Sequence, residues 1–183
     1  MNDERGENGT VLDIGSGMGI DSLTLRTVIH DDAAFTEWAA SGQDGAAPVL
    51  DRLFRDDPDG AQVALDQVGM TLPARRRDAL QAEIWRDQRR FDDAVDTYRR
   101  LIEEAPSPAR AAVLTQHLGK VRFAAGDYES ARDCFARALD MRLAQSPPAP
   151  ADQVESSRLA LSRVEQLLTD GRAEAGRAGS TTR

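Results

Sequence analysis

The chain has 183 residues, a net charge of −8 at pH 7 and only 5% aromatic residues. A chain of this length forms one domain that buries roughly two-thirds of its unfolded surface. The acidic residues gather at the front, because residues 1–73 carry four Arg against fourteen Asp and Glu, whereas residues 74–183 carry nineteen basic and seventeen acidic residues. Since phosphates are repelled by an acidic surface, this composition argues against nucleic-acid binding.

The cysteine content and the hydropathy of the sequence indicate where in the cell the protein resides. The single cysteine, Cys134, cannot form a disulfide within one chain, which favours a reducing environment. The first residues lack the basic and apolar regions of a secretory signal, and no apolar run approaches the ~20 residues that cross a bilayer. We therefore expect a cytoplasmic protein that does not bind membranes.

The first motif along the chain is the glycine-rich sequence VLDIGSGMG at residues 11–19. It resembles the first motif of S-adenosylmethionine-dependent methyltransferases, in which a strand ends in a glycine-rich turn that lets the backbone approach the cofactor. The remaining sequence lacks the alternating strands and helices that such a fold requires. We interpret residues 1–32 as an arm that is flexible or forms a short hairpin of Val11–Ile14 with Leu23–Ile29. The alternative function is a methyltransferase-like protein that binds S-adenosylmethionine at residues 11–19.

The strongest signal is an internal repeat with a shift of 37 residues. The shift places Ala82 on Gly119, Phe91 on Tyr128, Ala94 on Ala131 and Tyr98 on Phe135. Within each unit, apolar residues recur at spacings of three and four, which indicates one apolar face of a helix. A short turn divides each unit, so we predict helix hairpins over residues 75–108 and 112–145. Because one hairpin cannot bury its own apolar faces, the neighbours must stack.

The small residues of the repeat have a physical role. Two antiparallel helices approach closely only where a side chain is absent or is a methyl group. From Ala82 the series continues with Trp85, Ala94, Tyr98, Leu101 and Pro106, and from Gly119 it continues with Arg122, Ala131, Phe135, Ala138 and Leu143. This series resembles the tetratricopeptide repeat (TPR) family, with departures at Leu101, Arg122 and Leu143. The resemblance implies an all-α, TPR-like α-solenoid of stacked antiparallel helix hairpins.

Weaker elements flank the two repeats. Residues 42–74 repeat part of the same spacing around an acidic turn, and we interpret them as a degenerate repeat. After a proline-rich linker, residues 152–169 predict a helix that caps the stack. The helical domain then covers residues 33–170, and the tail at 171–183, rich in Gly, Ala, Ser, Thr and Arg, is expected to be disordered.

The resemblance also implies a groove lined by the first helix of each repeat. The candidate groove residues are Arg76, Glu83, Arg86, Asp87, Gln116, His117, Lys120, Phe123 and Arg158. Some family members hold a peptide's carboxylate with Lys, Asn and Arg side chains along this groove. Lys120 and Arg158 are loosely similar, although the asparagines are missing. We therefore expect a non-catalytic adaptor that binds a protein or peptide, with an acidic or carboxylate-bearing peptide as the more specific hypothesis.

Two alternatives for the groove and its surroundings stay open. The acidic N-terminal arm could fill the groove by lying along Arg76, Arg86, Lys120 and Arg158, or exposed end helices could pair copies into a homo-oligomer. We expect no catalytic residue, no cofactor and no metal. The two histidines of the chain are far apart in sequence and neither has metal-ligand spacing around it.

Overall fold

The computed structural model describes residues 9–180, and side chains within that range as far as residue 173. In these residues a small sheet precedes eight α-helices. The strands are β1 (Val11–Gly15), β2 (Met18–Asp21) and β3 (Thr27–Ile29). The helices are α1 (Asp32–Ala40), α2 (Ala47–Phe54), α3 (Pro58–Val68), α4 (Ala74–Asp87), α5 (Phe91–Glu103), α6 (Pro108–Ala124), α7 (Tyr128–Leu143) and α8 (Ala151–Ser180), with a single 3₁₀ turn, Gly69–Thr71, after α3.

The N-terminal segment forms an antiparallel sheet with the strand order β1-β2-β3. The sequence predicted a direct pairing of Val11–Ile14 with Leu23–Ile29, but β2 lies between β1 and β3 and pairs with both. The reason is the tight turn at Gly15 and Gly17, whose φ angles of 88° and 71° suit residues without a side chain. A side chain on Gly17 would also collide with the backbone of Asp31, so this glycine lets α1 start directly against the turn.

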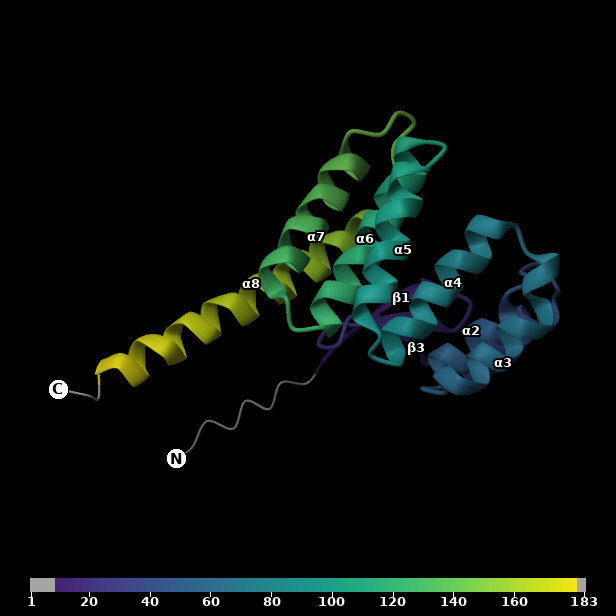
Figure 1. Ribbon diagram of the computed structural model, residues 1–183, viewed down its shortest axis with the longest axis horizontal. Coiled ribbons are helices and arrows are strands. Elements are labelled where there is room, and N and C mark those ends of the chain that lie inside the picture. The colour runs from purple at the N-terminus through teal and green to yellow at the C-terminus, as the bar shows by residue number, and fades with distance from the viewer. Residues whose placement is uncertain (1–8, 181–183) are drawn as a thin grey trace.

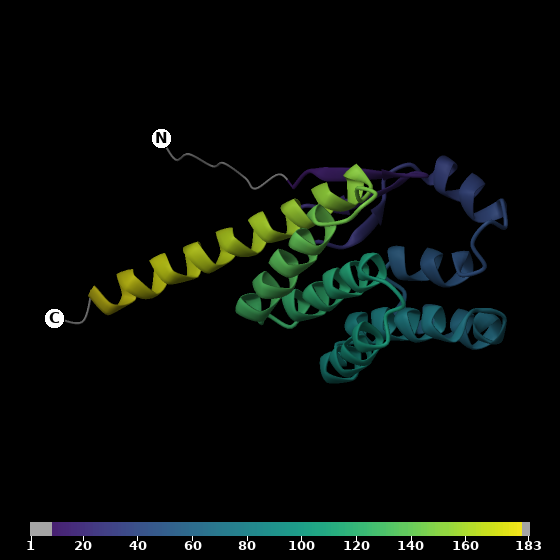
Figure 2. The ribbon, with the colours of Figure 1, turned by 90° about the horizontal axis from the view of Figure 1, so that it is seen from above.

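Successive helices pack as antiparallel hairpins, α2 with α3, α4 with α5 and α6 with α7, and α8 covers α7 (Figure 1). The expected all-α solenoid of stacked hairpins is confirmed, and the sheet is a minor addition. Viewed from above, α8 runs along the end of the stack and then projects beyond it (Figure 2).

Three apolar clusters follow one another along the stack, and each joins neighbouring hairpins. The first lies between α2, α3 and α4, where Leu65 packs against Leu80 and Ile84. The second joins α4, α5 and α6 around Tyr98, which is 1% exposed. The third joins α7 and α8 and also takes in Leu25 from the N-terminal segment. Because each cluster draws on more than one hairpin, no hairpin has a complete core of its own.

The small residues allow the close helix contacts that the repeat predicts. Ala82 and Ala94 are fully buried. At the equivalent place in the next hairpin, a methyl group on Gly119 would lie 2.5 Å from the ring of Phe135. That distance is shorter than van der Waals contact, so the α6–α7 pair requires a glycine there.

The end of the chain differs from the prediction. Helix α8 does not stop at residue 169 but continues to Ser180, into the segment 171–183 for which disorder was expected. The extension contains three glycines, Gly171, Gly176 and Gly179, each of which costs a helix about 1 kcal/mol relative to alanine, and Arg172 at its start forms an ion pair of 2.9 Å with Glu129 on α7. Residues 1–8 and 181–183 lie outside the described residues.

Among the described helices, none has an apolar stretch long enough to cross a membrane.

Candidate functional site

The N-terminal segment lies on the face of the stack that α2, α4, α6 and α8 share, which we call the inner face. The loop between β2 and β3 reaches across it. Leu25 is 2% exposed and packs against Phe135 and Val164. The Arg163 guanidinium on α8 donates to the Leu23 carbonyl at 3.2 Å. The sheet therefore roofs part of the surface that the sequence predicted to be an open groove.

The contacts of this segment differ in charge from those that the sequence suggested. One alternative from the sequence placed the acidic arm along the basic residues of the groove. Instead the N-terminal segment places a cation on the inner face, where the Arg26 guanidinium pairs with Asp56 at 2.5 Å and with Asp87 at 3.2 Å. Asp87 is only 6% exposed and lies at the end of α4, so it anchors Arg26 from within the inner face.

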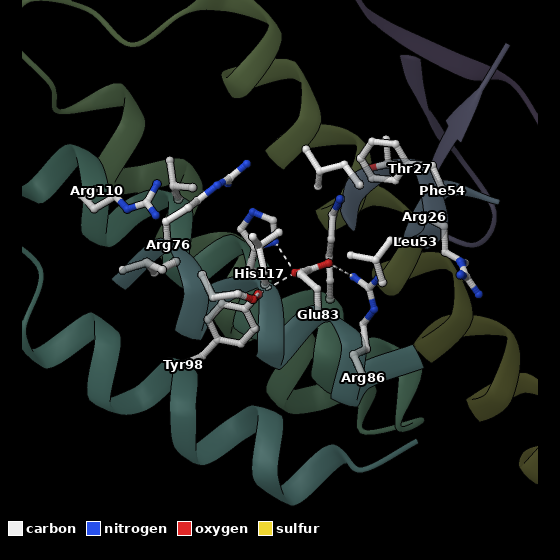
Figure 3. Close-up of a pocket in the computed structure, with 16 residues that line it drawn as sticks. Arg26, Thr27, Leu53, Phe54, Arg76, Glu83, Arg86, Tyr98, Arg110 and His117 are labelled. Atoms are coloured by element: carbon white, nitrogen blue, oxygen red, sulfur yellow. Dashed lines mark hydrogen bonds and ion pairs between the residues drawn. The ribbon is translucent and has the colours of Figure 1, made fainter. Parts of the chain in front are cut away.

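A cavity of about 230 Å³ remains between β3 and helices α2, α4 and α6; we call it the central cavity. Apolar side chains from α2 and α6 line part of it, including Leu53, Phe54 and Leu114. The charged and polar residues that line it are Arg26, Thr27, Arg76, Glu83, Arg86, Tyr98, Arg110, His117 and Lys120. In Figure 3 the guanidinium groups of Arg76 and Arg110 lie at one end of the cavity, with Glu83 near its middle.

Glu83 is the one carboxylate among the described lining residues, and three side chains form hydrogen bonds or ion pairs with it (Figure 3). The Tyr98 hydroxyl donates to Oε1 at 2.6 Å, and Nδ1 of His117 lies 2.7 Å from the same oxygen. Nη1 of Arg86 lies 2.6 Å from Oε2. The rings of Tyr98 and His117 stack with centroids 5.8 Å apart. This network ties α4, α5 and α6 together.

The pKa values of the network follow from these contacts. Burial alone would raise the pKa of Glu83, but the Arg86 guanidinium and the His117 ring hold it well below its ordinary value. Burial, together with the neighbouring Glu83 carboxylate, raises the pKa of Tyr98 well above its ordinary value. At neutral pH the carboxyl group is therefore ionised and the phenol keeps its proton, as the hydrogen bond between them requires.

Lys120 is a lining cation that no opposite charge contacts in the described structure. Its ammonium group has no hydrogen bond or ion pair within the described part of the chain, although it lines the central cavity and two neighbouring hollows. Burial, opposed by Glu83 and reinforced by Arg86 and Arg142, lowers its pKa to about 8. The Arg110 guanidinium likewise lines the cavity without a side-chain partner among residues 9–173. These two side chains are free to bind an anion.

The candidate groove residues are mostly brought together. The central cavity collects Arg76, Glu83, Arg86, His117 and Lys120.

Three further candidates lie beside the central cavity, and one lies apart. Asp87 and Phe123 line a hollow under the β2–β3 loop. Gln116 is 3% exposed, accepts from the Ser157 hydroxyl at 2.9 Å and lines a third hollow. Arg158 is the exception: it pairs with Glu155 on its own helix and does not line the cavity in the described structure. Its side chain is 57% exposed, since it faces outward from α8.

Sequence reasoning missed several lining residues. Arg26 and Thr27 belong to the N-terminal arm, and no periodicity in the sequence links that arm to the repeats. Tyr98 was assigned to the core, and its hydroxyl turns it into a partner of Glu83. A usable signal existed for this pair, because a buried tyrosine hydroxyl needs a hydrogen-bond partner. Arg110, in the first turn of α6, carried no signal at all.

The glycine-rich segment 11–19 forms the β1–β2 hairpin. Its glycines serve the chain reversal and the approach of α1, as described above. Binding of S-adenosylmethionine there stays a prediction. Among the described residues, no cluster of three or more His, Cys, Asp and Glu side chains has the arrangement needed to hold a metal ion.

Comparison with known proteins adds one family match. A family model described as tetratricopeptide repeat matches residues 79–107, which cover most of α4, the whole of α5 and the connection to α6. The match confirms, for this hairpin, the resemblance drawn from residue spacing. No curated protein and no solved structure matches the chain.

Proposed function

We propose that this chain, in which one hairpin matches the tetratricopeptide repeat, is a non-catalytic adaptor that binds a protein or a peptide. Support comes from the stacked hairpins, a design typical of proteins that present an extended surface to a partner. The partner would bind at the inner face, beside the N-terminal sheet that already covers part of it.

The central cavity is the observation that carries this proposal. Its lining contains five Arg and Lys side chains and one carboxylate, in a chain whose net charge is −8. The local charge is therefore opposite in sign to that of the whole molecule. Apolar residues such as Phe54 and Leu114 also line the cavity. An acidic peptide with an apolar side chain next to its carboxylate matches both the charged and the apolar lining.

A selection from a displayed library of random peptides tests the proposal. The full chain would be compared with the double variant Arg76→Glu/Lys120→Glu, which reverses two cavity charges. The matched control is Arg158→Glu, which reverses an exposed charge outside the cavity. We expect wild type and control to enrich the same acidic peptides, and the double variant to lose them.

Two results would count against the proposal. Enrichment of the same peptides by the double variant would mean that the central cavity does not recognise them. If the wild type enriches no peptide, with either internal or C-terminal peptide display, the proposal of peptide binding is wrong. Pairing of copies into a homo-oligomer is a separate prediction, which sedimentation at several concentrations tests.

A further inference from the structure

Arg142 is a buried cation without a counter-ion. The residue is only 5% exposed and lies near the end of α7. Its Nη1 donates to the Gln153 carbonyl at 2.5 Å and to the Ser157 hydroxyl at 2.6 Å, and both acceptors are neutral. Its Nε is buried and has no partner in the described structure. A buried charge that is hydrogen-bonded only to neutral groups is costly, and the exposed Asp152 carboxylate offsets that cost only in part, because burial still lowers the pKa of Arg142.

Lys120 faces the same place from α6. Both cations line a hollow of about 260 Å³ that is separate from the central cavity, and we call it the Arg142 hollow. The two charges are close enough to disfavour each other, because Arg142 contributes to the lowered pKa of Lys120. The two acids that act on Lys120 are already paired with other cations. Glu83 is occupied by its three donors, and Asp87 is paired with Arg26 and Arg86.

The rest of the Arg142 hollow is suited to a small polar ligand. Ile20 and Thr27 of the N-terminal sheet form its roof, and Gln116 and Ser156 add neutral polar groups. A volume of about 260 Å³ holds a tetrahedral anion with several waters, since one water takes roughly 30 Å³. The one carboxylate in the described lining, Asp152, is exposed at the start of α8 and forms no ion pair of 4 Å or less there.

We propose that the Arg142 hollow binds a phosphate group, held between the Lys120 ammonium and the Arg142 guanidinium under the N-terminal sheet. A phosphate dianion neutralises both cations at once, and the planar guanidinium of arginine offers parallel N–H donors that match phosphate oxygens. This site adjoins the central cavity and shares Lys120 and His117 with it, whereas Arg142 and Asp152 line the Arg142 hollow and not the central cavity.

Calorimetric titration of the full chain with inorganic phosphate, at pH 7 and constant ionic strength set with chloride, tests the proposal. We expect Lys120→Met to weaken phosphate binding tenfold or more. Asp152→Asn should strengthen it severalfold, because it removes the one negative charge in the lining. Arg158→Gln, a lost cation on the same helix but outside the hollow, should bind as the wild type does. Acetate should bind more weakly than phosphate.

A second titration, with phenyl phosphate, identifies the source of the phosphate group. Binding at least as tight as that of inorganic phosphate assigns the hollow to a phosphorylated organic molecule. Binding of inorganic phosphate alone assigns it to the free ion. Either result supports the site.

Three results would overturn the proposal: no phosphate binding at millimolar concentration, acetate binding as tightly as phosphate, or equal phosphate affinity in the wild type and Asp152→Asn. Asp152→Asn decides the matter even if Lys120→Met does not fold, because it changes an exposed side chain. Since Asp152 does not line the central cavity, this variant should leave peptide selection unchanged, and the two proposals can fail separately.

Discussion

The hairpins α4–α5 and α6–α7 pack through equivalent positions, but they carry opposite charges at the position that follows the small residue. Position 82 is alanine and its equivalent 119 is glycine, and both touch the neighbouring helix. The next position is Glu83 in the first hairpin and Lys120 in the second. The carboxylate has three partners, whereas the ammonium has none in the described structure.

The aromatic residue of each second helix explains part of this difference. In the first hairpin it is Tyr98, whose hydroxyl reaches Glu83. In the second hairpin it is Phe135, which fills the same space without a polar group to offer. The comparison teaches that size at the packing positions sets how the hairpins stack, while the polar groups around them, the Tyr98 hydroxyl among them, decide whether the adjacent charge has partners or remains available to a ligand.

Glu83→Gln should break the first hairpin's network most severely. The substitution removes one of the two carboxylates that pair with Arg86, which is 10% exposed and keeps its pair with Asp87. Removal of one partner of a buried pair costs about 3–5 kcal/mol, and the remaining Asp87 places the expected loss at the lower end of that range. Urea denaturation at pH 7 measures the change in the free energy of unfolding. Glu104→Gln, at an exposed ion pair, is the control and should change it by less than about 1 kcal/mol.

The same variant has a defined pH dependence. The pKa of Glu83 is lower in the folded chain than in the unfolded chain, so its ionisation stabilises the fold above about pH 4.5. That stabilisation is lost as the pH falls through the folded-state pKa. The difference between wild type and Glu83→Gln should therefore be constant near neutral pH and shrink in acid. A difference below about 1 kcal/mol at pH 7 would contradict the network.

Gly119→Ala tests the packing half of the comparison. The added methyl would lie 2.5 Å from the Phe135 ring, and overpacking of this kind costs about 2 kcal/mol. Gly171→Ala is the matched control on α8, where nothing lies within 4 Å, and it should stabilise the chain by up to about 1 kcal/mol. Denaturation curves that show both variants equally stable would mean that the α6–α7 contact is looser than described.

Tyr98→Phe makes the first hairpin resemble the second. It removes one donor from the Glu83 carboxylate, which costs about 1.5 kcal/mol for a hydrogen bond to a charged group. Tyr128→Phe is the control, because the Tyr128 hydroxyl makes no hydrogen bond within residues 9–173, and it should be close to neutral. Thermal denaturation in parallel measures both, and an equal shift in Tm for the two variants would disprove the role of the Tyr98 hydroxyl.

Lys120→Met should have the smallest effect and the opposite sign, a gain of about 1 kcal/mol at pH 7 from removing a desolvated charge. The folded chain releases the Lys120 proton near pH 8, whereas the unfolded chain keeps it to about 10.5. The unfolded state thus binds more protons between these values, so wild-type stability should rise with pH relative to the variant. Stability curves of the two proteins that stay parallel from pH 7 to 10 would refute this.

The sequence predicted the hairpins well because their packing is local and periodic. Small residues, rings and turns recur at a fixed shift, and each of them constrains the chain within one hairpin and its neighbour. The groove candidates followed from the same periodicity, which is why most of them meet at one cavity. The prediction for Arg158 was wrong because a shift of one residue, about 100° of rotation on α8, decides whether a side chain faces the stack, and the spacing after the proline-rich linker does not fix that rotation.

The N-terminal sheet could not be predicted in this way. Its place depends on contacts between distant residues, such as Arg26 with Asp87 and Leu25 with Phe135, and these leave no local pattern. The glycine turn at residues 15–17 was read as part of a cofactor motif because a tight hairpin and a cofactor-binding turn require the same backbone freedom.

The central claim is that the second hairpin holds a partly buried ammonium group that pairs with no carboxylate of the described residues. Lys120 is the only lysine of the chain, so labelling with ¹³C-lysine gives one signal for its Cε. An NMR titration of that signal in phosphate-free buffer measures the pKa directly. We expect a pKa of about 8. A value near the 10.5 of an ordinary lysine would contradict the account.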